Sequence, residues 1–291
     1  MILKEEFERW KAELSYVSDK ERWDYIARKI SELPNQNGRE ELESLLTFLT
    51  ESGMIPPKNK ETLVALIHGI RTRAEWHDNL RRKIKTVSSS EVKSIKYGFF
   101  DGVSFLIHRY AKKLDHLSEE LRLLKRDYPN HELVIVAHSF GTFLTLKFLQ
   151  KNLDYTVDRI LFCGAIICED YKFFSLANFP KEGSVLNDVG LRDIYPVLAK
   201  SFSLGYGASG TFGFNRHQVE NRYFDCGHSE FFTDKLFDDY WLPFILRGEI
   251  VESESTYRRP VTSYYLNFLA LFKGLGLVLV FTILLVVLFL L

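Results

Sequence analysis

The chain has 291 residues, of which 46% are hydrophobic and 26% are charged, a composition typical of one globular domain with appendages. Its 38 Lys and Arg residues balance its 38 Asp and Glu residues, so neither a basic surface for nucleic acid nor an acidic solvating tail is expected. The three cysteines (Cys163, Cys168 and Cys226) match no zinc, redox or disulfide pattern and predict buried thiols in a reducing compartment.

Residues 1–55 are expected to form a helical region. Apolar side chains recur there at helical spacing in three stretches, which Pro and Gly residues separate. Charge from Lys4 onward argues against a secretory signal. The region is interpreted either as a module that binds a protein partner or as an extension packed on the main domain. The apolar positions are Leu3, Phe7, Trp10, Leu14 and Val17, then Trp23, Ile26, Ile30 and Leu33, then Leu42, Leu45, Leu46 and Leu49.

The pattern changes at residue 60, and residues 60–248 predict an α/β domain. Short apolar runs, which are typical of buried parallel strands, alternate with helical segments. This alternation indicates a mostly parallel central sheet with helices on both faces. The predicted strands are residues 63–67, 94–100, 133–137, 159–167, 184–189 and 220–226. The predicted helices are residues 103–124, 140–150, 195–202 and 229–246.

The segment AHSFG, residues 137–141, carries the strongest chemical signal. It follows a predicted strand and opens a predicted helix. That is the context of a nucleophile elbow, in which a serine sits at strained backbone angles with its hydroxyl exposed above the sheet. Gly141 supplies the small residue that the tight turn needs, and Ala137 replaces the more usual glycine. Ser139 is the predicted nucleophile, and a capping serine at an ordinary turn is the alternative.

The segment HGI, residues 68–70, follows the first predicted strand. A glycine at this place leaves room for a substrate oxygen beside backbone N–H groups. The amides of Ile70 and Phe140, next to Gly69, are predicted to form an oxyanion hole. His68 is expected to shape this loop and not to transfer protons.

A nucleophilic serine needs a general base. His228 follows the last predicted strand on a loop that can turn back over the sheet toward Ser139, and it is the predicted base. His217 is its main rival, and His138, next to the nucleophile, is expected to point away from it. Four further histidines are expected at the surface: His77, His108, His116 and His131.

A carboxylate must orient the histidine and stabilise its cation. Asp193, which follows the fifth predicted strand, is the preferred acid. Asp188 is the second candidate, and Asp170, after the fourth strand, is the third. Helix capping is the alternative role for each of them. The glycine-rich residues 205–214 are interpreted as a lid over the site or as a surface loop.

Residues 249–291 are of a different kind. Residues 249–263, in which Glu and Ser alternate, predict a linker. Residues 264–291 predict a single-pass transmembrane helix, because the run from residue 274 has Thr282 as its one polar side chain and would extend about 27 Å, close to the ~30 Å hydrocarbon core. The preceding domain is then expected in the cytoplasm, and a buried apolar helix is the alternative. Aromatic and basic residues suited to a membrane interface flank the run: Arg258, Arg259, Tyr264, Tyr265 and Lys273.

Together these residues resemble the α/β-hydrolase superfamily over roughly residues 60–248. The resemblance rests on His68-Gly69, on the elbow at residues 137–141, and on Asp193 and His228 after later strands, in the family order Ser, Asp, His. It implies a parallel sheet flanked by helices and the hydrolysis of esters, amides or thioesters, with no metal or organic cofactor. The family's opening antiparallel strands have no counterpart in the helical N-terminal region.

The sequence thus predicts a membrane-anchored serine hydrolase, esterase- or lipase-like, acting on carboxylic esters. The anchor favours lipid or acyl-lipid esters as substrates. One alternative is a non-catalytic hydrolase-like module in a membrane interaction protein, against which the complete set of Ser, His and Asp argues. Another is a conditionally activated membrane effector whose N-terminal helices sense a partner, although nothing in the sequence identifies that partner.

Overall fold

The computed structural model describes residues 61–69, 75–96, 109–203 and 205–253, with the single residues 12, 13, 25, 105, 255, 268, 278, 282 and 286. The chain divides into two compact units, residues 1–60 and residues 61–291. The predicted helical region, residues 1–55, lies outside the described residues except at Ala12, Glu13 and Tyr25, which are helical. All the other described residues belong to the second unit.

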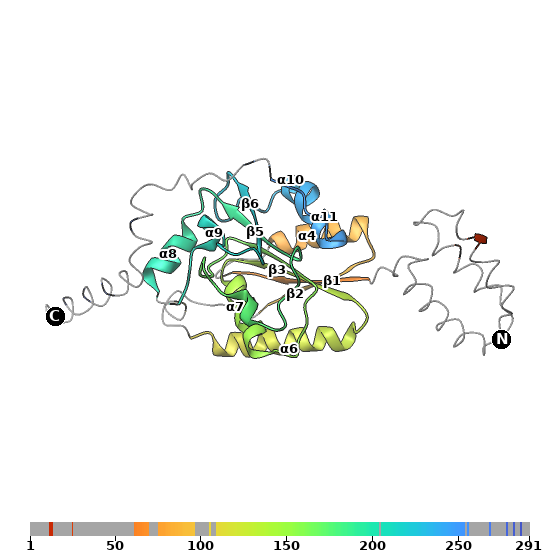
Figure 1. Cartoon of the computed structure of the whole chain (residues 1–291), viewed down its shortest axis with the longest axis horizontal. Coiled ribbons are helices and arrows are strands. Elements are labelled where there is room, and N and C mark those ends of the chain that lie inside the picture. The colour runs from red at the N-terminus through yellow and green to blue at the C-terminus, as the bar shows by residue number, and fades with distance from the viewer. Residues whose placement is uncertain are drawn as a thin grey trace. The chain divides into compact units, whose positions relative to one another are not determined.

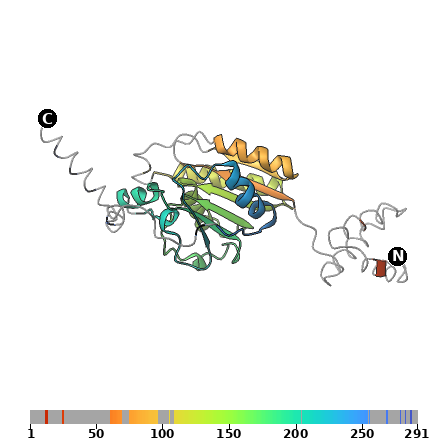
Figure 2. The ribbon, with the colours of Figure 1, turned by 90° about the horizontal axis from the view of Figure 1, so that it is seen from above.

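A six-stranded sheet forms the centre of this unit, and all of its neighbouring strands are parallel. The strand order is β2-β1-β3-β4-β5-β6, so the chain leaves β1 toward one edge and returns past it to β3. The parallel sheet flanked by helices confirms the predicted fold class (Figures 1 and 2). The strands are β1 Thr62–Ile67, β2 Glu91–Ile95, β3 Glu132–His138, β4 Arg159–Cys163, β5 Val185–Gly190 and β6 Glu220–Phe224.

Two strands differ from their predicted bounds by more than two residues at one end or both. β2 begins at Glu91 rather than residue 94 and ends at Ile95, and residues 97–100 lie outside the described ranges. β4 ends at Cys163 and does not reach residue 167, because Gly164 adopts a left-handed φ of 56° that no extended strand permits. The apolar residues beyond that glycine are buried in a loop, which explains why they resemble part of a strand in the sequence.

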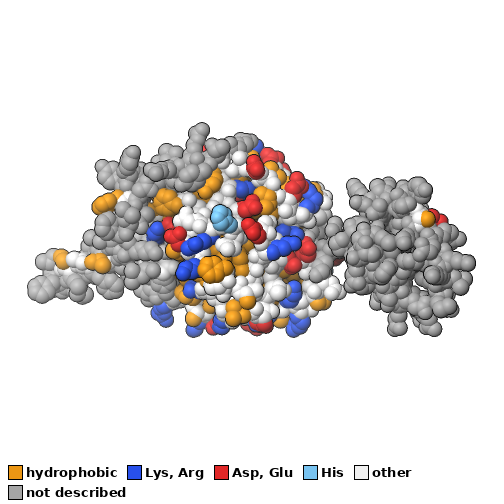
Figure 3. Space-filling view, in the orientation of Figure 1, with side chains coloured by type: hydrophobic (Ala, Val, Ile, Leu, Met, Phe, Trp, Pro, Cys, Tyr) orange, Lys and Arg blue, Asp and Glu red, His pale blue; other side chains and the backbone are white. Residues whose placement is uncertain are grey.

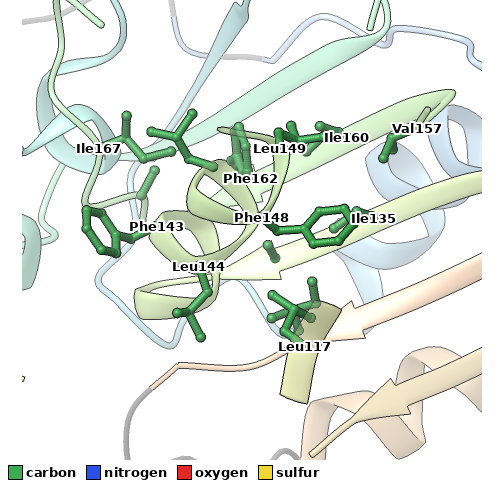
Figure 4. Packing of buried hydrophobic residues seen from close by; sticks show 14 of the residues in the cluster. Leu117, Ile135, Phe143, Leu144, Phe148, Leu149, Val157, Ile160, Phe162 and Ile167 are labelled. Carbon is green, nitrogen blue, oxygen red and sulfur yellow. The ribbon is translucent and has the colours of Figure 1, made fainter. Parts of the chain in front are cut away.

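Helices cover both faces of the sheet. Alternation along β3 sends Leu133, Ile135 and Ala137 toward α6 and α7, and sends Val134 and Val136 toward α4 and α11. The first of these layers is shown in Figure 4, where Phe148 and Leu117 pack over the strands. The helices are α4 Glu75–Val87, α6 Ala111–Asp127, α7 Phe140–Lys151, α8 Tyr195–Phe202, α9 Ser209–Phe212, α10 Asp234–Leu236 and α11 Leu242–Arg247, with a 3-10 turn at Phe173–Ser175 and a π-helical segment at Phe237–Trp241.

The helix α4 has no counterpart among the predicted elements. It presents Trp76, Leu80 and Ile84 to the sheet at helical spacing, and His77 shares this buried face. The prediction of a surface position for His77 is therefore wrong, since its side chain is 1% exposed. Burial lowers the pKa of His77 to about 3, so the ring is neutral in the folded chain at neutral pH.

The glycine-rich residues 205–214 are neither a lid nor a surface loop. Tyr206, Ala208 and Thr211 are buried. The backbone of this segment is hydrogen-bonded to the loop after β4, and Gly210 N donates to Ala165 O at 2.7 Å. A Cβ on Gly210 would lie 2.2 Å from Ala165 N, so glycine is what permits this close approach. Gly207 and Gly210 therefore serve close backbone packing.

The predicted helix 229–246 is also interrupted. Residues 228–231 form a turn, and the helical run starts at α10, where the Thr233 side chain accepts a hydrogen bond from Leu236 N. Part of the predicted linker, residues 249–263, is attached to the sheet as well. Ser253 Oγ accepts a hydrogen bond from Tyr223 N at 3.0 Å, and Ser255 forms an antiparallel bridge to the same strand.

No helix within the described part of the chain has the length and apolar character needed to cross a bilayer. The predicted anchor, residues 264–291, lies outside that part except for four helical residues. The transmembrane helix therefore stays a prediction.

Candidate active site

The register of three adjacent strands brings three loops together at the carboxyl edge of the sheet. Ile67 of β1 pairs with Ala137 of β3, so residue 69 lies opposite Ser139. His138 pairs with Cys163 of β4, so Gly164 lies on the other side of Ser139. The serine thus occupies the point where the strand order reverses, which is where parallel α/β sheets bind ligands.

Ser139 has the backbone angles of a strained elbow. Its φ of 54° and ψ of −122° make it the one non-glycine residue with positive φ among the described residues. Such a conformation costs of order 1–3 kcal/mol and is held by its surroundings. Ser139 N donates to Cys163 O at 3.0 Å, and a Cβ on Gly141 would lie 2.6 Å from Ile67 O. The predicted elbow is thus present, with β3 before it and α7 after it.

Gly69 lies directly against the serine. A Cβ at residue 69 would stand 2.7 Å from Ser139 Cβ and 3.1 Å from Ser139 Oγ. Only a glycine permits the backbone to approach the serine side chain this closely. Phe140 is the first residue of α7, at the positive end of the helix dipole, a position compatible with the predicted role of its amide as an oxyanion donor. Ile70, the other predicted donor, lies outside the described residues. His68 Nδ1 lies 2.6 Å from the Gly69 carbonyl oxygen, within the loop that it is predicted to shape.

His228 and Asp193 are paired. His228 Nδ1 lies 2.8 Å from Asp193 Oδ2, and the carboxylate is fully buried. The other carboxylate oxygen accepts a hydrogen bond from Tyr195 N at 3.0 Å, which fixes its orientation. Because a carboxylate accepts, Nδ1 carries the hydrogen, and Nε2 of a neutral ring is left to accept a proton.

The two other candidate acids are engaged elsewhere. Asp188 accepts two hydrogen bonds from the Arg222 guanidinium at 2.8 and 3.1 Å, and one from Trp241 Nε1 at 2.8 Å. This buried ion pair joins β5, β6 and the π-helical segment, and it leaves Asp188 no access to His228. Asp170 is exposed and accepts from Asn215 Nδ2 at 3.0 Å. Asp193 is the carboxylate that the structure brings to His228.

The rival histidine, His217, is exposed in the segment before β6. His138, expected to point away from the nucleophile, is fully buried and reaches the loop that carries His228: its Nε2 lies 3.0 Å from His228 O. Burial lowers the pKa of His138 well below its usual range. Of the other histidines expected at the surface, His116 is half-buried, His131 is half-buried beside Glu61, and His108 lies outside the described residues.

Two supporting residues have no counterpart in the predicted site. Gly164 underlies the histidine, since a Cβ there would stand 2.9 Å from His228 Nδ1 and 3.2 Å from Asp193 Oδ2. Thr211 Oγ1 donates to Asp193 O at 2.6 Å, so the glycine-rich segment holds the loop of the acid. Neither role leaves a local sequence signal, because both depend on which loops the sheet places side by side.

No family model and no curated protein sequence matches this chain. Solved structures similar to it include TT1662 from Thermus thermophilus, 14% identical over 62% of this chain and 87% of that chain, with a TM-score of 0.40. Others are a cold-adapted esterase from an Arctic intertidal metagenomic library, 13% identical over 66% and 85% with a TM-score of 0.41, and XC6422 from Xanthomonas campestris, an α/β serine hydrolase without lid, 13% identical over 66% and 83% with a TM-score of 0.39. Likenesses at these TM-scores carry no argument about activity, which has to be inferred from the residues of this chain.

The contact between Gly164 and His228 predicts the effect of adding one methyl group. Gly164→Ala should displace the imidazole from Asp193 and abolish the low-field proton resonance of the Nδ1 hydrogen, measured by NMR. Gly183→Ala is the matched control, because Gly183 also has a positive φ (77°) but no atom lies within 4 Å of where its Cβ would stand. Both substitutions should lower the free energy of unfolding by roughly 1–2 kcal/mol. An unchanged resonance in Gly164→Ala would contradict the placement of His228 over residue 164.

Proposed function

We propose that the chain is a serine hydrolase that cleaves carboxylic esters through an acyl-enzyme on Ser139. The observation that carries the proposal is the 2.8 Å pairing of His228 with the buried Asp193, on loops beside a serine at strained elbow angles. A serine hydroxyl is too weak an acid to attack unaided, and an imidazole oriented by a carboxylate supplies the base that it needs.

In the proposed reaction Ser139 Oγ bonds to the ester carbonyl carbon while its proton passes to His228 Nε2. The carbonyl π electrons move onto oxygen, and Asp193 stabilises the imidazolium. Collapse of this intermediate breaks the bond to the alcohol oxygen, which takes the proton from His228. Water then attacks the acyl-enzyme by the same route and releases the acid together with the free serine.

The oxyanion of each intermediate is assigned to the amides of Ile70 and Phe140. The close approach of Gly69 to the serine side chain supports this assignment, because Gly69 directly precedes Ile70 in the chain and lies against the hydroxyl. One such donor is worth about 10² to 10³ in rate in other enzymes.

The proposed substrate carries an apolar acyl or alcohol group, as lipid esters do. Ile194 and Tyr195 follow the acid directly and are 39% and 59% exposed. The Tyr195 ring lies 4.8 Å from the His228 ring, so this apolar surface borders the base. On the face shown in Figure 3, acidic and basic side chains are interspersed over the described surface, which offers no continuous basic field for nucleic acid.

Residues 264–291 are proposed to anchor the enzyme in a membrane. Besides the apolar sequence, the support is that Val278 and Val286 are helical and 61% and 51% exposed. Apolar helix surface of this kind is stable in hydrocarbon and costly in water. The proposal places the hydrolase domain on the cytoplasmic side.

The pairing of His228 with Asp193 predicts unequal effects for the acidic residues. Asp193→Asn should lower kcat for p-nitrophenyl octanoate about 10⁴-fold, and His228→Ala by at least as much. Asp170→Asn is the matched control and should leave kcat within about twofold, because this exposed carboxylate does not contact the histidine. Equal losses of kcat in Asp193→Asn and Asp170→Asn would refute the assignment of Asp193 as the acid. The wild type should also be assayed with p-nitrophenyl acetate, and a higher kcat for this short ester than for the octanoate would refute the apolar acyl subsite.

The anchor predicts how the protein distributes after cell lysis. The full chain should pellet with membranes and resist extraction by high salt, whereas a chain lacking residues 264–291 should stay in the supernatant. Both are followed by immunoblotting of the fractions, with ester hydrolysis as the control for folding. A folded, active, truncated chain that still pellets would contradict the anchor.

A further inference from the structure

His138 lies at the end of β3, directly before the nucleophile. Alternation along the strand turns its side chain to the face of Val134 and Val136, away from Ala137. There it is fully buried among aromatic rings, 4.9 Å from Phe232 and 4.5 Å from His228 between ring centroids. The end of β3 thus places Ser139 at the elbow and the His138 ring against the ring of His228.

The hydrogen-bonding of the His138 ring fixes its tautomer. Nε2 lies 3.0 Å from the backbone carbonyl oxygen of His228, which only accepts, so Nε2 carries the hydrogen. Burial keeps the ring neutral, which leaves Nδ1 as an acceptor. Nδ1 has no hydrogen-bond partner among the described residues and stands 3.5 Å from where a Cβ on Gly69 would lie.

A histidine at this position costs stability. A buried polar atom without a hydrogen-bond partner is unfavourable, and a phenyl ring of similar size would avoid that cost. A phenyl ring, however, could not donate a hydrogen bond to the His228 carbonyl oxygen. The loop that carries His228 is also held at the protein surface by ion pairs of Arg192 with Asp225 and Glu230. The side chains of these three residues are at least half exposed. Exposed pairs of this kind contribute little, so the bond from His138 to the His228 backbone is a buried tie of this loop, in addition to the bond between Asp193 and the imidazole.

We propose that His138 is a positioning residue that holds the His228 backbone, and through it the imidazole, in place over Ser139. The inference rests on the proposed function, because it concerns the same base. The side chain of His138 does not itself touch the reacting atoms. It links the β3 elbow, the loop of Gly69 and the loop of His228, and its neutral ring adds no second positive charge when His228 becomes an imidazolium.

Three variants test this role. His138→Phe keeps a ring but removes the donor, whereas His138→Gln keeps an N–H donor at the same distance along the side chain. His77→Phe is the matched control, because His77 is also buried beside Trp76 but neither ring nitrogen has a partner among the described residues. For each variant we would measure kcat and KM for p-nitrophenyl butyrate, the urea midpoint, and hydrogen–deuterium exchange of the peptide spanning residues 225–232.

The expected result for His138→Phe is a kcat lower by about tenfold to a hundredfold with KM within twofold, since a displacement of about 1 Å can cost this much. Exchange in residues 225–232 should become faster. His138→Gln should recover most of the kcat and of the exchange protection, and His77→Phe should behave as the wild type in both. A kcat near wild type in His138→Phe, or equal losses in His138→Gln and His138→Phe, would overturn the inference.

Failure of the proposed function is distinguishable from failure of this inference. A folded wild-type chain without any ester hydrolysis would refute the proposed function. In that case hydrogen–deuterium exchange alone tests the positioning role. Protection of residues 225–232 from exchange that is lost in His138→Phe and recovered in His138→Gln would support the role. Protection that is unchanged in His138→Phe would refute it.

Discussion

The pairing register of β1, β3 and β4 is the constraint on which the rest of the site depends. It sets Gly69, Ser139 and Gly164 side by side on three neighbouring strand ends. A shift of one residue in either pairing would turn every side chain of a strand to the opposite face and break both hydrophobic layers. The packing of the two layers therefore fixes the geometry of the site as firmly as it fixes the sheet.

Two buried aspartates near this edge of the sheet, Asp188 and Asp193, have different partners and therefore different roles. Asp188 is neutralised by Arg222 and capped by Trp241, so it ties β6 to the sheet. Asp193, five residues later, is buried, and among the described residues its carboxylate is hydrogen-bonded to His228 and to the backbone amide of Tyr195. A carboxylate in this position can orient the imidazole and stabilise it after it has accepted a proton. That difference in partners explains why one aspartate stabilises the fold while the other can support a base.

Much of this arrangement could be predicted from the sequence, because local patterns carry it. The predicted strands overlap all six strands of the sheet, although the one predicted at residues 94–100 shares only residues 94 and 95 with β2, and the context of the elbow located Ser139 at the end of β3. The helix α4 was missed because His77 and the charged residues beside Trp76 obscure its apolar face. The glycines of residues 205–214 suggested mobility, whereas they permit backbone contact with a loop far away in sequence. Contacts of this kind, such as that of His138 with the loop of His228, join segments that are far apart in the sequence. They depend on the topology of the sheet and therefore leave no local sequence pattern.

The central claim is that Ser139 is an activated nucleophile. It is tested most directly by reaction of the folded full chain with a fluorophosphonate probe, followed by peptide mass spectrometry to locate the modified residue. The account predicts a single modification on the peptide that contains Ser139 and no labelling of Ser139→Ala. Labelling that survives in Ser139→Ala, or a modification on another residue of the wild type, would contradict it.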